Sequence, residues 1–135
     1  MRSVLSKIST RWRVLCAGTL LAAIVPSVSN AAEAPGGIFD LQGGEAIYRN
    51  VCQGCHMVDA RGAVGAGHYP ALAGNPRLAT SAYVMTMILK GRNGMPPLSH
   101  NLTDQQIADV TNYVRGHFGN HFAGQVTAAD VQPLR

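Results

Sequence analysis

The feature that most limits what this chain can fold into is a pair of cysteines with two residues between them and a histidine directly after, Cys52-Gln53-Gly54-Cys55-His56. Two thiols at this spacing lie on one helical turn, so each can add to one vinyl group of the same porphyrin. The adjacent histidine then lies under the iron. The motif therefore predicts one covalent haem, held by Cys52 and Cys55 as thioethers, with His56 as an axial iron ligand.

Two other kinds of site use cysteines at this spacing. A dithiol redox centre is expected near a βαβ pattern, and the chain contains none. A zinc site would need further ligands, and His117 and His121 do form an H-x-x-x-H pair. However, 61 residues separate Cys55 from His117, far more than in compact zinc fingers. We expect the haem, which also gives the chain a large apolar surface to pack around.

The first 31 residues have the pattern of a cleaved secretory signal. An apolar run at 14–25 is followed by Pro26 and small residues, and cleavage is expected after Ala31, with Ala34 as a second option. Twelve apolar positions are too few to cross roughly 30 Å of hydrocarbon, so no permanent membrane anchor is expected. The basic residues ahead of the run are Arg2, Lys7, Arg11 and Arg13. The pattern predicts a bacterial periplasmic protein.

The positive charge of the chain belongs to this signal. The full sequence has 11 Lys and Arg against 7 Asp and Glu, and removal of residues 1–31 takes away four cations and no acidic residue. The remainder, residues 32–135, is neutral and has no polybasic run, so no nucleic-acid partner is expected. Its length suits one domain, with a core at about 43–118 and a C-terminal extension at 119–135.

Hydrophobic periodicity predicts an all-α fold with three main helices. A first helix at 43–51 leads into the motif, and a second, Ser81 to Lys90, ends at Gly91. A third begins at Thr103, where Gln106 completes a capping box, and runs to about residue 118. Because residues 59–77 and 91–101 are rich in glycine and proline, they are expected to be irregular. For residues 120–135 we expect one more helical turn at Thr127 to Asp130 and then a free end, with docking to a partner subunit as the alternative.

The second axial ligand is expected to be Met95. This residue precedes Pro96, so its backbone is biased towards an extended conformation. A thioether is a soft ligand that stabilises ferrous iron and raises the reduction potential above that of a bis-histidine haem. With both axial positions filled, the iron can only change oxidation state, which predicts an electron carrier. If Met95 were structural, the open iron would instead indicate a haem enzyme or a gas sensor.

Other side chains are also candidates for iron or haem contacts. Met57 adjoins His56 and cannot reach the opposite face of the ring, and the methionines of the second helix, Met85 and Met87, are expected to fill the core. For two pairs of residues, two roles remain open. Arg92 and Asn93 are candidates for contacts to a haem propionate or for plain solvated surface, and His68 and His100 are expected to be solvated or hydrogen-bonded loop residues with iron ligation as the alternative.

Besides the cysteine motif, the chain contains Gly44, Tyr48, Tyr69-Pro70-Ala71-Leu72, Gly94-Met95-Pro96 and Asn112-Tyr113-Val114. In these motifs the chain resembles, from about Gly43 to Phe118, the class I cytochromes c. The resemblance implies the cytochrome c fold, in which loops wrap around one haem c and the first and last helices cross. It also implies that the carbonyl of Pro70 accepts a hydrogen bond from the free ring nitrogen of His56. The helix contact would then comprise Gly44, Ile47, Tyr48, Val110, Tyr113 and Val114.

A narrower resemblance concerns partners. The segments 94–97, 112–115 and 126–131 resemble those of small cytochrome subunits that accompany bacterial periplasmic dehydrogenases. This implies an electron carrier, not itself an enzyme, that takes electrons from a dehydrogenase and passes them to another cytochrome or an oxidase of the respiratory chain. A freely diffusing shuttle is the alternative, but the near-neutral surface disfavours electrostatic steering. The expected contact is the haem edge beside the thioethers, ringed by uncharged residues such as Ala63 and Val64.

Overall fold

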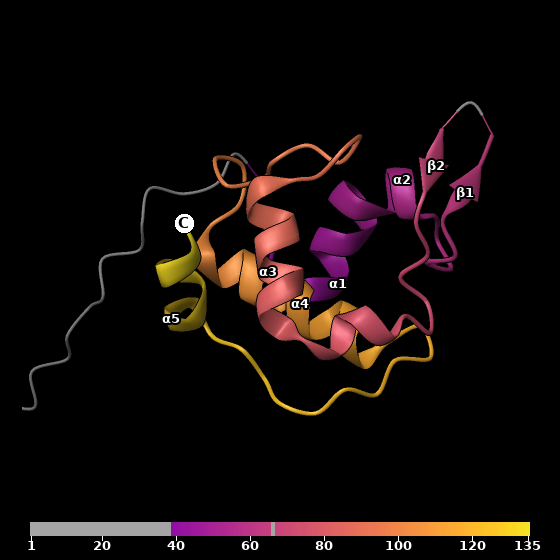
Figure 1. The fold of residues 1–135 in the computed structure, drawn as a ribbon. Coiled ribbons are helices and arrows are strands. Elements are labelled where there is room, and N and C mark those ends of the chain that lie inside the picture. The colour runs from indigo at the N-terminus through magenta and orange to yellow at the C-terminus, as the bar shows by residue number, and fades with distance from the viewer. Residues whose placement is uncertain (1–38, 66) are drawn as a thin grey trace, which may run out of the picture. The chain divides into compact units, whose positions relative to one another are not determined.

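The computed structural model describes residues 39–65 and 67–135 (Figure 1), so the expected export signal lies outside the described residues. Within those ranges, no helix is long and apolar enough to cross a membrane. The helices are α1 (Gly44–Ile47), α2 (Gln53–His56), α3 (Ser81–Lys90), α4 (Asp104–Gly116) and α5 (Ala128–Val131), with a π-helical turn η1 (Tyr48–Cys52) and 3-10 turns η2 (Pro76–Ala79) and η3 (Gln132–Leu134). Two short strands, β1 (Ala63–Val64) and β2 (His68–Tyr69), complete the elements.

The cysteine motif lies at the end of one helical stretch. The elements α1, η1 and α2 succeed one another without a break, so the predicted first helix extends as far as His56. The stretch is bounded by two residues with positive φ, Gly43 at 79° and Met57 at 69°. A π-helical turn contains an extra residue, which rotates the next part of the helix about its axis. The position of η1 therefore sets the direction in which the motif faces.

Helices α1 and α4 pack against each other, as the resemblance implies (Figure 1). Gly44 lies at their contact. A side-chain carbon at Gly44 would collide with the backbone carbonyl of Asp109 and lie only 2.5 Å from the Cβ of Tyr113. Beside this contact, the ring of Tyr48 lies 5.8 Å from that of Tyr113. The predominantly helical architecture, with α3 also packed on α4, confirms the predicted fold class.

Helix α4 begins where the sequence predicts and ends earlier. Thr103 Oγ1 accepts from the backbone N–H of Gln106 at 3.1 Å, and the Gln106 side chain accepts from the N–H of Thr103 at 2.9 Å, so the capping box is confirmed. The predicted end at about residue 118 is two residues too late. His117 is extended, and Asn120 donates to the carbonyl of Val114, which stops the helix at Gly116.

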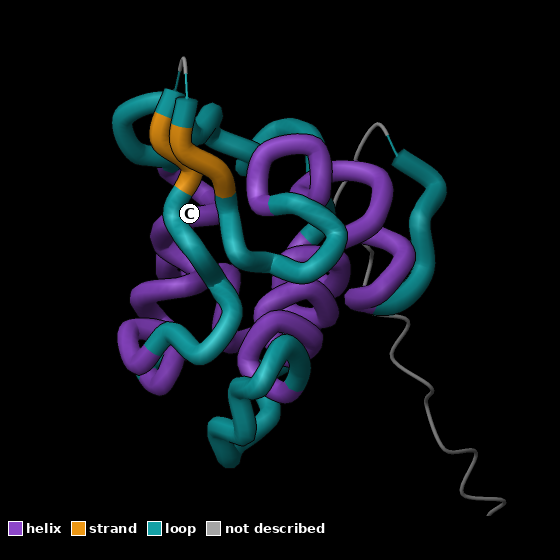
Figure 2. The backbone as a smooth tube through the Cα atoms, turned by 90° about the vertical axis from the view of Figure 1, so that its right-hand side faces the viewer, coloured by secondary structure: helices purple, strands orange, loops and turns teal. Residues whose placement is uncertain are grey.

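The segment 59–77 is less irregular than predicted. Ala63 pairs with Tyr69 and Val64 with His68 in an antiparallel hairpin, whose two strands lie side by side in Figure 2. Farther along, Asn75 Oδ1 accepts from the N–H of Arg77 and begins η2. Strands of two residues are too short to show an alternating pattern, so they could not be predicted from the periodicity of the sequence.

The expectation of a free C-terminal end is wrong. Val131 is completely buried, and α5 packs on α4. The side-chain amide of Asn112 donates to the carbonyl of Val126 at 2.8 Å and accepts from its N–H at 2.9 Å. It thus pairs with both backbone groups of Val126, as a neighbouring strand would. The Thr127–Asp130 capping box then starts α5. The tail, residues 119–135, is therefore part of the folded unit.

Candidate functional site

His56 is held in one orientation by the loop that comes after it. The side chain is 9% exposed, and its Nδ1 lies 2.9 Å from the carbonyl oxygen of Pro70. A carbonyl only accepts, so Nδ1 carries the proton and donates, which leaves the lone pair on Nε2. Backbone hydrogen bonds from Gly62 to His56 and from Leu72 to Ala60 fold the loop so that Pro70 reaches the ring. This is the contact that the resemblance implies, and it leaves a nitrogen suited to a metal.

The two cysteines of the motif, Cys52 and Cys55, lie on the same helical stretch, and neither is in a disulfide. Cys52 is half-buried and Cys55 is exposed. Burial raises the pKa of the Cys52 thiol to about 12, and the neighbouring Cys55 adds to the shift. Dithiol exchange starts from a thiolate, and a raised pKa keeps the Cys52 thiol protonated, so Cys52 does not suit that chemistry. Among residues 39–65 and 67–135, no group of three or more His, Cys, Asp or Glu side chains is placed to hold a metal ion.

Tyr48 supports the backbone directly after the motif. Its hydroxyl donates to the carbonyl of Met57 at 2.7 Å, and its ring packs against Phe118 at a centroid distance of 4.8 Å. Burial is the main cause that raises the pKa of Tyr48 to about 12. The resemblance implies for Tyr48 only a place in the contact between the first and last helices. Its second role as a hydrogen-bond donor depends on the positive φ of Met57, for which the sequence gives no signal.

Met95 lies at the end of a tight turn. The N–H of Arg92 donates to the carbonyl of Met95 and the N–H of Met95 donates to the carbonyl of Arg92, both at 3.0 Å. Between them Asn93 adopts a φ of 53°. Gly91, at a φ of 64°, is so close to the backbone of Met95 and Pro96 that a side chain there would collide with both. The half-buried side chain of Met95 packs against the core, so the thioether is presented from a fixed backbone.

A shallow depression of about 460 Å³ lies near this turn and is lined by Arg77, Thr80, Tyr83 and Arg92. Its lining offers two guanidinium groups and two hydroxyls and no carboxylate, so it suits an anionic group. Of the two predicted propionate contacts, Arg92 lines the depression and Asn93 does not. Arg77 and Tyr83 were missed, because only the fold brings η2 and α3 beside the turn at Arg92.

The donor set fits a haem iron. Free thiols on one helical turn, an imidazole with an available Nε2 and a thioether from a fixed turn are the groups that hold a covalent haem. The fit rests on two observations: neither cysteine is in a disulfide, and the Pro70 carbonyl leaves the correct nitrogen of His56 available. His68 and His100 are both exposed, and His117 is exposed and stacks on Tyr113 at 4.1 Å.

Comparison with known proteins gives one matching family and several relatives. The family model described as cytochrome c oxidase, cbb3-type, subunit III matches residues 39–114. The cytochrome c subunit of the quinone alcohol dehydrogenase of Gluconobacter oxydans is 37% identical over an alignment of 105 residues, and the match covers 68% of this chain and 22% of that protein. The cytochrome c subunit of gluconate 2-dehydrogenase of Pantoea cypripedii is 35% identical over an alignment of 108 residues, and the match covers 71% of this chain and 24% of that protein.

A further relative, the fructose dehydrogenase cytochrome subunit of Gluconobacter japonicus, is 36% identical over an alignment of 107 residues, and the match covers 68% of this chain and 22% of that protein. The matched part thus covers most of the described residues. In each of these relatives it amounts to less than a quarter of the protein's length.

Proposed function

Because the chain belongs to this family of c-type cytochromes and carries a covalent haem c, we propose that it is an electron carrier whose iron is ligated by His56 and Met95. The observation that carries the proposal is the hydrogen bond from His56 Nδ1 to the Pro70 carbonyl. It orients the ring and leaves Nε2 as the only nitrogen with a lone pair for the iron. The turn at 92–95 supports Met95 as the second ligand, since it presents a thioether from backbone that is already fixed.

Each residue then has a distinct task. Cys52 and Cys55 hold the porphyrin by thioether bonds, so it stays attached whatever the equilibrium affinity. When bound, haem c supplies an iron that changes between two oxidation states. Arg92, together with Arg77, neutralises the propionates in the basic depression. With His56 and Met95 as its ligands, the iron would offer no open position to substrate or oxygen, so the chain would transfer electrons without catalysing a reaction.

The proposed donor is a periplasmic dehydrogenase and the proposed acceptor another cytochrome or an oxidase of the respiratory chain. The relatives support the donor, because they are named as cytochrome subunits of quinone alcohol, gluconate and fructose dehydrogenases. Export by residues 1–31 would place the chain in the same compartment. Val58, three residues after Cys55, and Val64 in β1 are 68% and 84% exposed. These exposed apolar side chains suit the small, weak interface of a redox encounter.

The ligation is tested by absorption spectra of the protein exported together with a haem-maturation system. We expect the ferric form to show the methionine–iron charge-transfer band and the ferrous form to ignore carbon monoxide. Met95→Ala should lose the band and bind carbon monoxide. Met85→Ala is the matched control, because Met85 is a buried core methionine of α3, and it should keep both properties. Ready binding of carbon monoxide by the unmodified protein would favour an open-site enzyme or sensor.

The partnership is tested separately from the ligation. The tagged protein should co-purify with a dehydrogenase from its own periplasm, and that enzyme should reduce the haem on addition of its substrate. Val64→Glu should slow this reduction while the spectra stay unchanged, since a buried charge at the contact is costly. A protein that always elutes alone and is reduced by no dehydrogenase would be a freely diffusing shuttle.

A further inference from the structure

The segment that carries Met95, residues 91–102, joins α3 to α4 and contains neither helix nor strand. Its first part is held by the turn at 92–95 and by the N–H of Leu98, which donates to the carbonyl of Ile88 in α3 at 2.9 Å. A second turn comes next, in which the N–H groups of Asn101 and Leu102 both donate to the carbonyl of Leu98. The last part of the segment, residues 99–102, is held by a side chain from the C-terminal tail.

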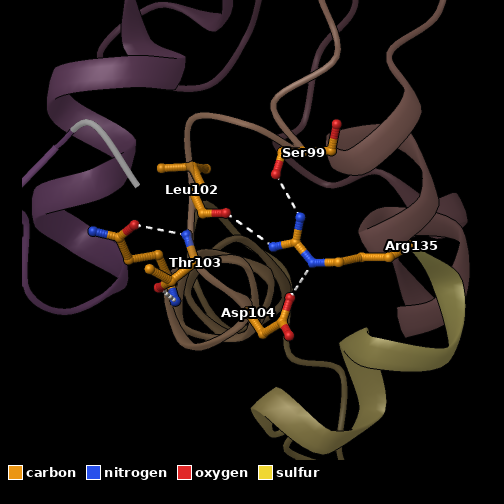
Figure 3. Close-up of polar contacts among 6 residues, drawn as sticks. Ser99, Leu102, Thr103, Asp104 and Arg135 are labelled. Carbon is orange, nitrogen blue, oxygen red and sulfur yellow. Dashed lines mark hydrogen bonds and ion pairs between the residues drawn. The ribbon is translucent and has the colours of Figure 1, made fainter. Parts of the chain in front are cut away.

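The side chain that holds this part of the segment is the guanidinium group of Arg135 (Figure 3). Its Nε donates to Asp104 Oδ1 at 2.5 Å, and its two terminal nitrogens donate to the carbonyls of Ser99 and Leu102, the latter at 3.0 Å. The Asp104 side chain is only 9% exposed, so the ion pair is shielded from water on that side. One side chain thus joins the end of the Met95 segment to the first residue of α4.

Arg135 is itself held in place by the docking of the tail. Val131 is completely buried, and Asn112 pairs with both backbone groups of Val126. The guanidinium therefore reaches the Met95 segment from backbone that is fixed to α4. Because it is planar and presents several donors, it can bind a carboxylate and two carbonyls at once, which a lysine cannot.

We propose that Arg135 is a positioning residue for Met95, which it keeps in reach of the iron by fixing residues 99–104. The proposal rests on the His/Met ligation proposed above. Without Arg135 the carbonyls of Ser99 and Leu102 lose their donor. The segment then gains conformations in which Met95 is away from the iron. The population of those conformations, rather than the global stability, is what Arg135 is inferred to control.

The test is an imidazole titration of the ferric haem-loaded protein. Imidazole binds the iron only when Met95 has left it, so its apparent Kd falls as the population without Met95 grows. We expect Arg135→Ala to lower the apparent Kd about tenfold, a factor that corresponds to about 1.4 kcal/mol. Arg135→Lys keeps a charge for Asp104 but cannot satisfy both carbonyls, so its Kd should lie between the two.

Two control variants separate positioning from charge and from stability. Arg49→Ala removes the same charge from an exposed pair with Glu45 on α1 and should leave the Kd unchanged. Val110→Ala opens a cavity in the buried core of α4 away from the Met95 segment, and should lower the unfolding midpoint without changing the Kd. Equal affinities in Arg135→Ala and Arg49→Ala, or an equal gain in Val110→Ala, would overturn the proposal.

The failure of this inference is distinguishable from a failure of the proposed ligation. If the unmodified ferric protein lacks the methionine–iron band, the His/Met ligation is wrong and the inference falls with it. If the band is present and Arg135→Ala leaves the imidazole affinity unchanged, the ligation stands and only the role of Arg135 is refuted.

Discussion

Single side chains that bond to backbone carbonyls hold the chain around the haem motif. Tyr48 donates to the carbonyl after His56, and His56 in turn donates to the carbonyl of Pro70. Both bonds cross from the helical stretch 44–56 to the loop beyond it. A net contribution of about 1 kcal/mol is ordinary for such a bond, but its larger effect is to restrict the loop to one path.

At this scale we predict that Tyr48→Phe lowers the free energy of unfolding by about 1 kcal/mol at neutral pH, because the Met57 carbonyl loses its donor. The free energy of unfolding of the variant should also depend less on pH in the alkaline range. The pKa of Tyr48 is about 12 in the folded protein against an ordinary value of 10.0, so the unfolded chain releases this proton first. The stabilisation is therefore complete below pH 10 and is lost as the pH rises from 10 towards 12.

Urea unfolding followed by circular dichroism at several pH values checks both parts of this prediction. Tyr69→Phe is the matched control, since Tyr69 is 39% exposed and should change neither the midpoint nor its pH dependence. An alkaline loss of stability as steep in Tyr48→Phe as in the unmodified protein would contradict the assignment to Tyr48.

At the scale of the elements, the crossing of α1 and α4 depends on the absence of a side chain at Gly44. We predict that Gly44→Ala costs about 1–3 kcal/mol, because the added carbon would force the helices apart at Asp109 and Tyr113. Gly116→Ala is the control on α4, since nothing lies within 4 Å of an added carbon there. It should be neutral or stabilise by up to about 1 kcal/mol. Thermal unfolding of the two variants measures the difference, and equal midpoints would refute the close crossing.

A second prediction at this scale concerns Arg115, which joins α4 to two neighbouring segments. The residue is 5% exposed. Its guanidinium donates to four carbonyls, those of Leu78 and Ala79 at 3.0 and 3.3 Å and those of Ala123 and Gly124 at 2.7 and 2.6 Å. Arg115→Lys should cost about 3 kcal/mol, because one ammonium cannot reach carbonyls on both sides and hydrogen bonds from charged groups contribute strongly.

The control for Arg115 is Arg49→Lys, in which the exposed pair with Glu45 is retained and the change should stay within about 0.5 kcal/mol. Chemical denaturation of both variants gives the comparison. A loss in Arg115→Lys no larger than in Arg49→Lys would mean that the segments at 78–79 and 123–124 do not depend on this side chain.

At the scale of the whole molecule, the core is assembled from distant parts of the chain. The half-buried apolar side chains that surround the buried core, among them Val51, Leu72 and Leu98, come from three different parts of the chain. A group that binds the folded chain and not the unfolded one raises its stability. The proposed covalent bonds through Cys52 and Cys55 would make the contribution of the haem independent of the concentration of free haem.

We therefore predict that the double variant Cys52→Ala, Cys55→Ala no longer carries haem through denaturing electrophoresis and unfolds at a lower temperature. A haem stain of the gel and a thermal melt by circular dichroism check the two parts. The single variant Cys55→Ala should retain the stain through Cys52. A stain that persists in the double variant would show that the attachment uses another residue.

Much of the site could be predicted from short stretches of sequence, because its chemistry is local. The spacing of Cys52, Cys55 and His56 spans about one helical turn and by itself predicts the attachment of a haem. The capping box at Thr103 and the glycine at 91 likewise predict where helices begin and end from a few neighbouring residues. The ligation by His56 and Met95 stays a prediction until the spectra are measured. The two-residue strands of the hairpin fell below the length at which periodicity carries information.

Contacts between distant parts of the chain were decided only by the tertiary structure. Arg115, Asn120 and Arg135 look like ordinary polar residues in the sequence, yet each bonds to carbonyls of segments that only folding brings beside it. The docking of the tail likewise depends on partners offered by α4. A motif spacing or a helix cap depends on neighbours in sequence, whereas the partners of a buried guanidinium depend on the packing of every element around it.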